Sequence, residues 1–129
     1  MLGSGSGGNA VVIESGGRRL LLDAGFSCRE LIKRMKVLGV DPAGIEALVL
    51  THEHQDHRRG ADGFAKRFKV PVHGTEGTLR GTPLQEEVNR SAVLMRSGVP
   101  RQVAGFWVEA FGIPHDAREP VGLVVEDAL

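Results

Sequence analysis

The chain has 129 residues, of which 41% are hydrophobic and 25% charged, values that fit a single globular domain over residues 1–129 and argue against disorder. Sixteen basic residues balance sixteen acidic ones, so the overall charge does not indicate a strongly basic nucleic-acid binder. No apolar stretch is long enough to span a membrane, so we expect no membrane partner. Cys28 is the single cysteine and cannot form an internal disulfide, so we expect a cytoplasmic protein.

A glycine- and serine-rich segment, residues 3–8, begins the chain and formally matches the spacing G-x-G-x-x-G. A dinucleotide-binding loop of that spacing follows a strand and opens a helix. Here a strand-like run, residues 9–15, comes after the glycines, and no strand precedes them. We therefore reject a dinucleotide site and interpret the segment as a flexible or tightly turning start, with a vector-derived linker as the alternative.

Strand-like and helix-like segments alternate along the next part of the chain. Ser27 and Glu30 have the spacing of a capping box, which predicts a helix that begins there and ends before Gly39. In chain order we expect strands at 10–15 and 18–23 joined by a glycine pair, a helix at 27–38, a turn at 41–44, a strand buried on both faces at 45–50, a helix at 61–68 and a short strand at 70–73.

The second half of the chain gives weaker patterns. Residues 75–98 favour helical or irregular structure, and residues 106–113 and 121–125 predict paired strands across the loop 114–120. The order of elements predicts an α/β sandwich with a mixed sheet and flanking helices.

The segment that indicates chemistry is THEHQDH, residues 51–57, which holds three of the five histidines. It follows an apolar strand, so alternate side chains of His52 and His54 can converge on one ion. Neutral imidazoles suit zinc, with manganese or iron as alternatives. The zinc-protease motif needs histidines four apart on a helix, so it does not apply. The alternative interpretation is an exposed polar loop that is rich in histidine.

Further residues of this loop extend the candidate site. Asp56 and His57 are adjacent, and a loop could aim both at a second ion beside the first. Arg58 and Arg59 could contact a substrate phosphate, although a pair of arginines on the surface is a common feature with no such role.

These patterns resemble a known family. The run T-H-x-H-x-D-H at residues 51–57 is similar to the signature of the metallo-β-lactamase-fold hydrolases. Gly8-Asn9, Leu21–Gly25, Ile45–His54 and Ile113–Ala117 are, with their spacing, similar to the exonuclease-like subfamily called YycJ or WalJ. The resemblance covers essentially the whole chain.

The resemblance implies a ligand set. His52, His54 and His115 would bind the first ion, and Asp56 and His57 the second. In such enzymes a metal-bound hydroxide attacks the scissile bond, and the aspartate that matches Asp56 also helps to orient that water, which makes Asp56 the candidate catalytic residue.

Two aspartates would support these ligands. The resemblance implies that Asp23 holds the site together from the end of the second strand. Asp116 could hydrogen-bond His115 and fix its tautomer, although a plain turn is equally consistent with the residues around His115.

Members of the family are longer, and their metal set is completed by a bridging Asp and a further His that lie C-terminal to the position of Leu129. We therefore expect the N-terminal half of a metallo-β-lactamase-type αββα sandwich, with a weak second ion and an open apolar face that a homodimer would cover. The implied function is metal-dependent hydrolysis, as a phosphodiesterase or exonuclease on DNA or RNA. The alternatives are a thioester or lactone hydrolase and a catalytically incomplete metal-binding or interaction domain.

Overall fold

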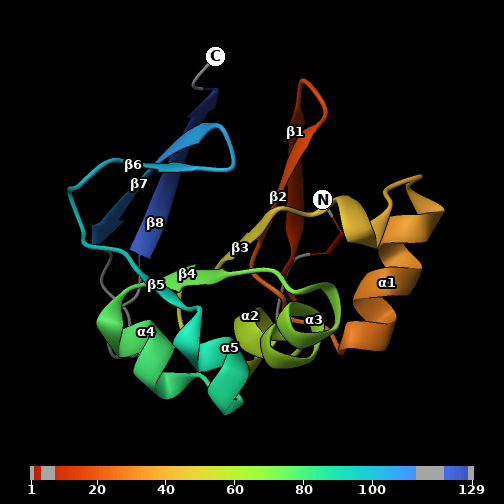
Figure 1. The fold of residues 1–129 in the computed structure, drawn as a ribbon, viewed down its shortest axis with the longest axis horizontal. Coiled ribbons are helices and arrows are strands. Elements are labelled where there is room, and N and C mark those ends of the chain that lie inside the picture. Colours follow the sequence, from red (N-terminus) through yellow and green to blue (C-terminus); the bar gives the residue numbers. More distant parts are fainter. Residues whose placement is uncertain (1, 4–7, 113–120, 128–129) are drawn as a thin grey trace.

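The computed structural model describes residues 2–3, 8–112 and 121–127, which form two β-sheets and a layer of helices (Figure 1). The first sheet contains β1 Val11–Ser15, β2 Arg18–Leu22, β3 Ala47–Val49, β4 Val72–Gly74 and β5 Val93–Leu94. The second contains β6 Arg101–Val103, β7 Phe106–Gly112 and β8 Val121–Asp127. The helices are α1 Cys28–Val37, α2 Gln55–Arg58, α3 Ala61–Phe68, α4 Glu76–Gly81 and α5 Glu86–Arg90, with a 3₁₀ turn at Pro42–Gly44.

The first sheet is mixed, as the sequence predicted. Its strands lie in the order β1-β2-β3-β4-β5; β1 and β2 are antiparallel, and the remaining neighbours are parallel. The predicted hairpin joins β1 to β2 through Gly16 and Gly17, which have φ angles of 57° and 80° that glycine adopts at little cost. Because β2, β3 and β4 are parallel, their carboxyl ends lie at the same edge of the sheet, where loops can bring side chains together.

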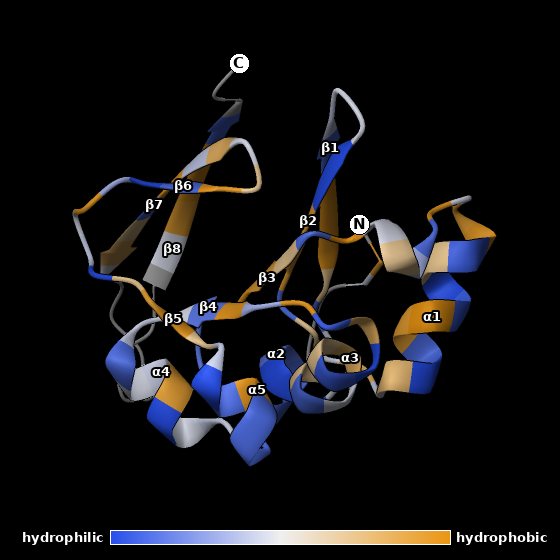
Figure 2. Ribbon diagram, viewed as in Figure 1, coloured by the Kyte–Doolittle hydropathy of each residue, from blue (hydrophilic) through white to orange (hydrophobic). Residues whose placement is uncertain are grey.

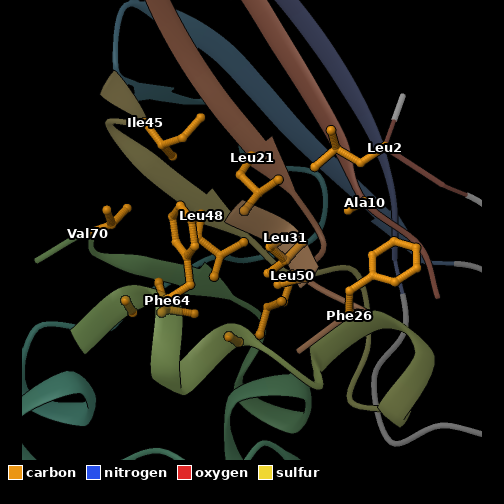
Figure 3. Packing of buried hydrophobic residues seen from close by; sticks show 14 of the residues in the cluster. Leu2, Ala10, Leu21, Phe26, Leu31, Ile45, Leu48, Leu50, Phe64 and Val70 are labelled. Carbon is orange, nitrogen blue, oxygen red and sulfur yellow. The ribbon is translucent and has the colours of Figure 1, made fainter. Parts of the chain in front are cut away.

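Helices cover one face of this sheet. Ser27 begins α1 as predicted, since its hydroxyl accepts the backbone N–H of Glu30 at 3.2 Å, while the Glu30 carboxylate pairs with Arg34 instead of closing the capping box. Strand side chains pack against the helices in the main core (Figure 3), which includes Leu21, Leu31, Leu48, Leu50, Phe64 and Val72. Figure 2 shows β3 and the leucine-rich end of β2 as hydrophobic and α2 and α5 as largely hydrophilic.

The second sheet covers the other face of the first sheet, opposite the helices. Alternation along the strands turns Leu20 and Val49 away from the helices, and both are fully buried against Phe106 and Val108 of β7. We expected a second copy of the chain to cover this face. The structure shows that this face is not open, because β6, β7 and β8 of the same chain cover it.

The predicted elements of the second half need other corrections. The strand predicted at 70–73 is β4, which begins later, at Val72, directly after Pro71, and lies inside the sheet. Residues 75–98 form two short helices and β5, and β6 was not predicted; both strands are too short for a periodic pattern to show. β7 and β8 pair antiparallel, as predicted. Within the described residues no helix has the length and apolar character needed to cross a membrane.

Candidate metal centre

The candidate centre begins where β2 and β3 end side by side. Leu22 pairs with Val49, and the N–H of Asp23 donates to the carbonyl of Val49 at 2.8 Å, so the two strands stay joined for one more residue. Asp23 then adopts a φ of 60°, a left-handed conformation that aspartate tolerates better than most residues. This turn places the Asp23 carboxylate against the loop that follows β3.

The Asp23 carboxylate is nearly buried and accepts hydrogen bonds from two residues of that loop. Thr51 donates its backbone N–H to Oδ1 at 2.8 Å and its hydroxyl to Oδ2 at 2.8 Å. His57 lies with Nδ1 2.7 Å from Oδ2. Since an ionised carboxylate only accepts, Nδ1 of His57 carries the hydrogen, and Nε2 keeps the lone pair that a metal ligand needs. Asp23 therefore joins Thr51 and His57 through hydrogen bonds, and the supporting role at a metal centre that the resemblance implies for it stays a prediction.

His52 is oriented through the same carboxylate by way of Thr51. Its Nδ1 lies 3.0 Å from the Thr51 hydroxyl oxygen. Because the hydroxyl hydrogen is directed to Asp23, that oxygen accepts the Nδ1 hydrogen of His52, so Nε2 again keeps the lone pair that a metal ligand needs. Sequence reasoning gave Thr51 no role. The available signal was its place directly before the first histidine of the motif.

Three of the predicted ligands lie close together in the segment that follows β3. His52, His54 and Asp56 each offer a ligand atom, and these atoms all lie within 4.8 Å of one another. Ligand atoms around one tetrahedral zinc ion are about 3.4 Å apart, given metal–nitrogen distances of about 2.0–2.1 Å, and two ions of a pair are about 3.5–4 Å apart, so a group within 4.8 Å fits ligands of one ion or of two neighbouring ions. The donor set of two imidazoles and a carboxylate fits zinc.

His57 borders this group, with its Nε2 3.6 Å from Oδ2 of Asp56 and its ring centroid 3.7 Å from that of His52. Its role as a ligand of a second ion stays a prediction. His115 and Asp116, the remaining predicted members of the centre, lie outside the described residues.

Close backbone contacts fix the loop that carries the ligands. The N–H of Ala24 donates to the carbonyl of His57 at 2.7 Å, and the N–H of Gly60 donates to the carbonyl of Ala24 at 2.7 Å. A Cβ atom on Gly25 would lie far inside van der Waals contact with the carbonyl oxygen of Asp56. The segment 23–25 therefore holds residues 56–60 by direct backbone contact, which only glycine permits at position 25.

The two arginines of the loop differ in their surroundings. Arg58 is partly buried, and its Nε donates to the carbonyl of Glu53 at 3.1 Å, which ties the loop to the end of α2. Arg59 is exposed beside α2. A contact of either residue with a substrate phosphate stays a prediction.

His73 stands apart from the metal-binding group. It lies within β4 and is only 6% exposed. Burial is the main cause that lowers its pKa, and the charge of Arg101 lowers it further, against an opposing effect of the carbonyl groups of Leu48 and Pro71.

Comparison with known proteins bears on this geometry. Residues 3–125 match the family described as the metallo-beta-lactamase superfamily. The chain belongs to this superfamily. It is 28% identical over 124 residues to the exodeoxyribonuclease WalJ of Streptococcus pneumoniae, covering 93% of this chain and 46% of that protein. It is also 28% identical over 123 residues to the exodeoxyribonuclease YycJ of Bacillus anthracis, covering 94% and 47%.

Solved structures of the superfamily share the fold. The Rm3 metallo-beta-lactamase superimposes with a TM-score of 0.79 at 17% identity, covering 92% of this chain and 50% of that one. The chain thus spans about half the length of the relatives and structures that it matches, and it has the α/β architecture predicted for half of this fold.

Proposed function

We propose that this superfamily member carries the metal centre of a hydrolase that cleaves phosphodiester bonds of DNA or RNA, with removal of nucleotides from strand ends as the specific reaction. The observation that carries the proposal is the grouping of His52, His54 and Asp56 within 4.8 Å of one another at the carboxyl end of β3. The names of the relatives WalJ and YycJ, both exodeoxyribonucleases, support the choice of nucleic acid as the substrate class.

Different residues of the chain would bind the ion, orient its ligands and orient the attacking water. His52 and His54 bind the ion through imidazole nitrogens, and Asp23 and Thr51 hold the ring of His52 in the tautomer that binding needs. A divalent ion at this site supplies Lewis-acid polarisation of the substrate and activation of water. The Asp56 carboxylate, whose side chain is 32% exposed, accepts a hydrogen bond from the attacking water and so orients it.

Substrate contact would depend on a few local charges. The chain has no net charge, so attraction of a phosphate must come from groups beside the centre. Arg59 is exposed within five residues of His54, and Arg58 lies on the same short segment. We propose that these guanidinium groups contact the phosphate next to the scissile bond.

Substrate class is tested by comparing three chemistries with the same preparation. The 129-residue chain, supplied with zinc or manganese, is incubated with end-labelled DNA and RNA oligonucleotides, a thioester and a lactone. We expect slow release of nucleotides, because the described residues offer a second ion only Asp56 and His57. His54→Ala and a chelator should each abolish this release, whereas His73→Gln should retain it.

Other outcomes contradict the proposal in different ways. Faster turnover of the thioester or lactone than of the oligonucleotides would assign the centre to another hydrolase class. Metal binding without hydrolysis of the oligonucleotides, the thioester or the lactone would favour a metal-binding or interaction module. Release of nucleotides that His54→Ala leaves intact would show that the centre is not the site of the reaction.

A further inference from the structure

Asn9 makes three hydrogen bonds to Asp56, although 47 residues separate them in sequence. Its backbone N–H donates to the Asp56 carbonyl at 2.7 Å. Its side-chain Nδ2 donates to the same carbonyl at 3.1 Å and to Oδ2 of the carboxylate at 3.2 Å. On its other side, the carbonyl of Asn9 accepts the N–H of Gly25 at 2.9 Å. Asn9 therefore lies between two segments that form the candidate metal centre.

The residues around Asn9 explain how the chain reaches this position. A Cβ atom on Gly8, whose φ is 149°, would lie 2.5 Å from Cε1 of Phe26, so only glycine lets the backbone pass so close to that ring. The guanidinium carbon of Arg34 lies 3.9 Å from the ring centroid of Phe26, and Nη1 of Arg34 donates to the carbonyl of Leu2 at 2.8 Å. Close packing on Phe26 thus fixes the backbone directly before Asn9.

We propose that Asn9 is a positioning residue for the metal centre, whose side-chain amide holds the Asp56 carboxylate in the orientation that binds the ion. A partly exposed carboxylate rotates among several conformers, and a donor on one of its oxygens restricts that rotation. Each carboxylate oxygen has two lone pairs, so the bond from Nδ2 leaves acceptor capacity for an ion. This inference rests on the proposed metal centre and adds to it a residue outside the histidine-rich loop.

Zinc affinity tests this role without relying on activity. Asn9→Ala removes the side-chain donor, and Asn89→Ala is the matched control, because Asn89 is the other asparagine of the chain and is exposed on α5. Competition with a chromophoric chelator gives the zinc dissociation constants. We expect Asn9→Ala to weaken the binding of at least one ion about tenfold, the range for residues that orient metal ligands, and Asn89→Ala to change it less than twofold.

A double-mutant cycle separates positioning from general support of the loop. In Asp56→Ala the carboxylate is absent, but the carbonyl that accepts from Nδ2 remains. If Asn9 acts through the carboxylate, adding Asn9→Ala to Asp56→Ala should change zinc affinity less than twofold. An equal loss in both backgrounds would assign Asn9 a structural role only and overturn the proposal.

A measurement on the unaltered chain covers the case in which Asn9→Ala fails to fold. With two asparagines, the side-chain amide resonances of Asn9 can be assigned by nuclear magnetic resonance. We expect zinc to shift these resonances and to leave those of Asn89 in place. Zinc binding that leaves the Asn9 amide unmoved would overturn this inference alone, whereas failure of the chain to bind zinc would overturn the proposed centre with it.

Discussion

Strands β3 and β4 are neighbours in the sheet, and histidines follow the first and lie within the second, but the surroundings of these histidines differ. After β3, the rings of His52 and His57 are held through hydrogen bonds that lead to the Asp23 carboxylate. At β4, Nδ1 of His73 is buried and has no hydrogen-bond partner among the described residues. The histidines after β3 thus have tautomers that suit metal binding, whereas His73 is a core residue without such support among the described residues.

The largest expected difference concerns two glycines: Gly25, which follows β2 and contacts the segment after β3, and Gly74, which ends β4. Gly25→Ala places a Cβ atom against the backbone oxygen of Asp56, which cannot move without breaking the contact with Asn9, so we expect a loss of about 3 kcal/mol or more of the free energy of unfolding. Gly74→Ala at the end of β4 meets Cδ2 of Leu79 at 3.2 Å, a side chain that can shift. Its loss should be below about 1 kcal/mol. Urea unfolding of both variants measures the difference, and equal losses would show that the backbone contact at Gly25 is not tight.

Removal of the supporting carboxylate should have the next largest effect. Asp23→Ala leaves the N–H of Thr51 and Nδ1 of His57 without their acceptor, which should cost about 3 kcal/mol in unfolding free energy and weaken zinc binding about 10–100-fold. Asp41→Ala is the control, because Asp41 only caps an exposed 3₁₀ turn through the N–H of Ala43. Unchanged zinc affinity in Asp23→Ala would show that Asp23 does not support the ligands.

Two threonines, Thr51 and Thr75, allow the same comparison, with smaller expected changes in zinc affinity and in unfolding free energy. Thr51→Val keeps the shape of the side chain but removes the link between His52 and Asp23, so zinc affinity should fall about tenfold. Thr75 follows β4, and its buried hydroxyl donates to Thr78 at 3.1 Å. Thr75→Val should therefore lower the free energy of unfolding by about 1 kcal/mol without changing zinc affinity. A loss of affinity in both variants would indicate a general effect of the sheet edge.

The smallest expected effect concerns pH. Burial lowers the pKa of His73 below its ordinary value of 6.5, so the folded chain releases this proton more readily than the unfolded chain. The stability that neutral His73 gives is complete above 6.5 and is lost as pH falls from there toward the folded pKa. His73→Gln should flatten the fall in unfolding free energy below that pH. An identical pH dependence in both proteins would contradict burial as the cause.

Local signals in the sequence were sufficient for much of the fold. The glycine pair 16–17 predicted the hairpin, Ser27 predicted the start of α1, and residues 61–68 form α3 with the predicted bounds. β5 and β6 have two and three residues, too few for a period to be detected, and they form because other strands pair with them. The interior position of β4 likewise depends on pairing with strands distant in sequence.

Part of the candidate site could likewise be predicted from local sequence, and part could not. The alternate positions of His52 and His54 after a strand were enough to predict that these two side chains lie together, and the structure groups them with Asp56 of α2. The bonds from Asn9 to Asp56 and from Thr51 to Asp23 join residues 47 and 28 positions apart. No spacing rule covers such distances, and only the folded arrangement of β2, β3 and the segment before β1 brings these residues together.

Calorimetric titration of the purified 129-residue chain with zinc, beside His54→Ala and His73→Gln, is the decisive test of the metal centre. We expect at least one zinc ion bound per chain. Zinc affinity should fall at least about 100-fold in His54→Ala and stay unchanged in His73→Gln, because His54 belongs to the metal-binding group and His73 does not. Zinc binding that is equally strong in His54→Ala, or that disappears in His73→Gln, would contradict the assignment of the centre to the loop after β3.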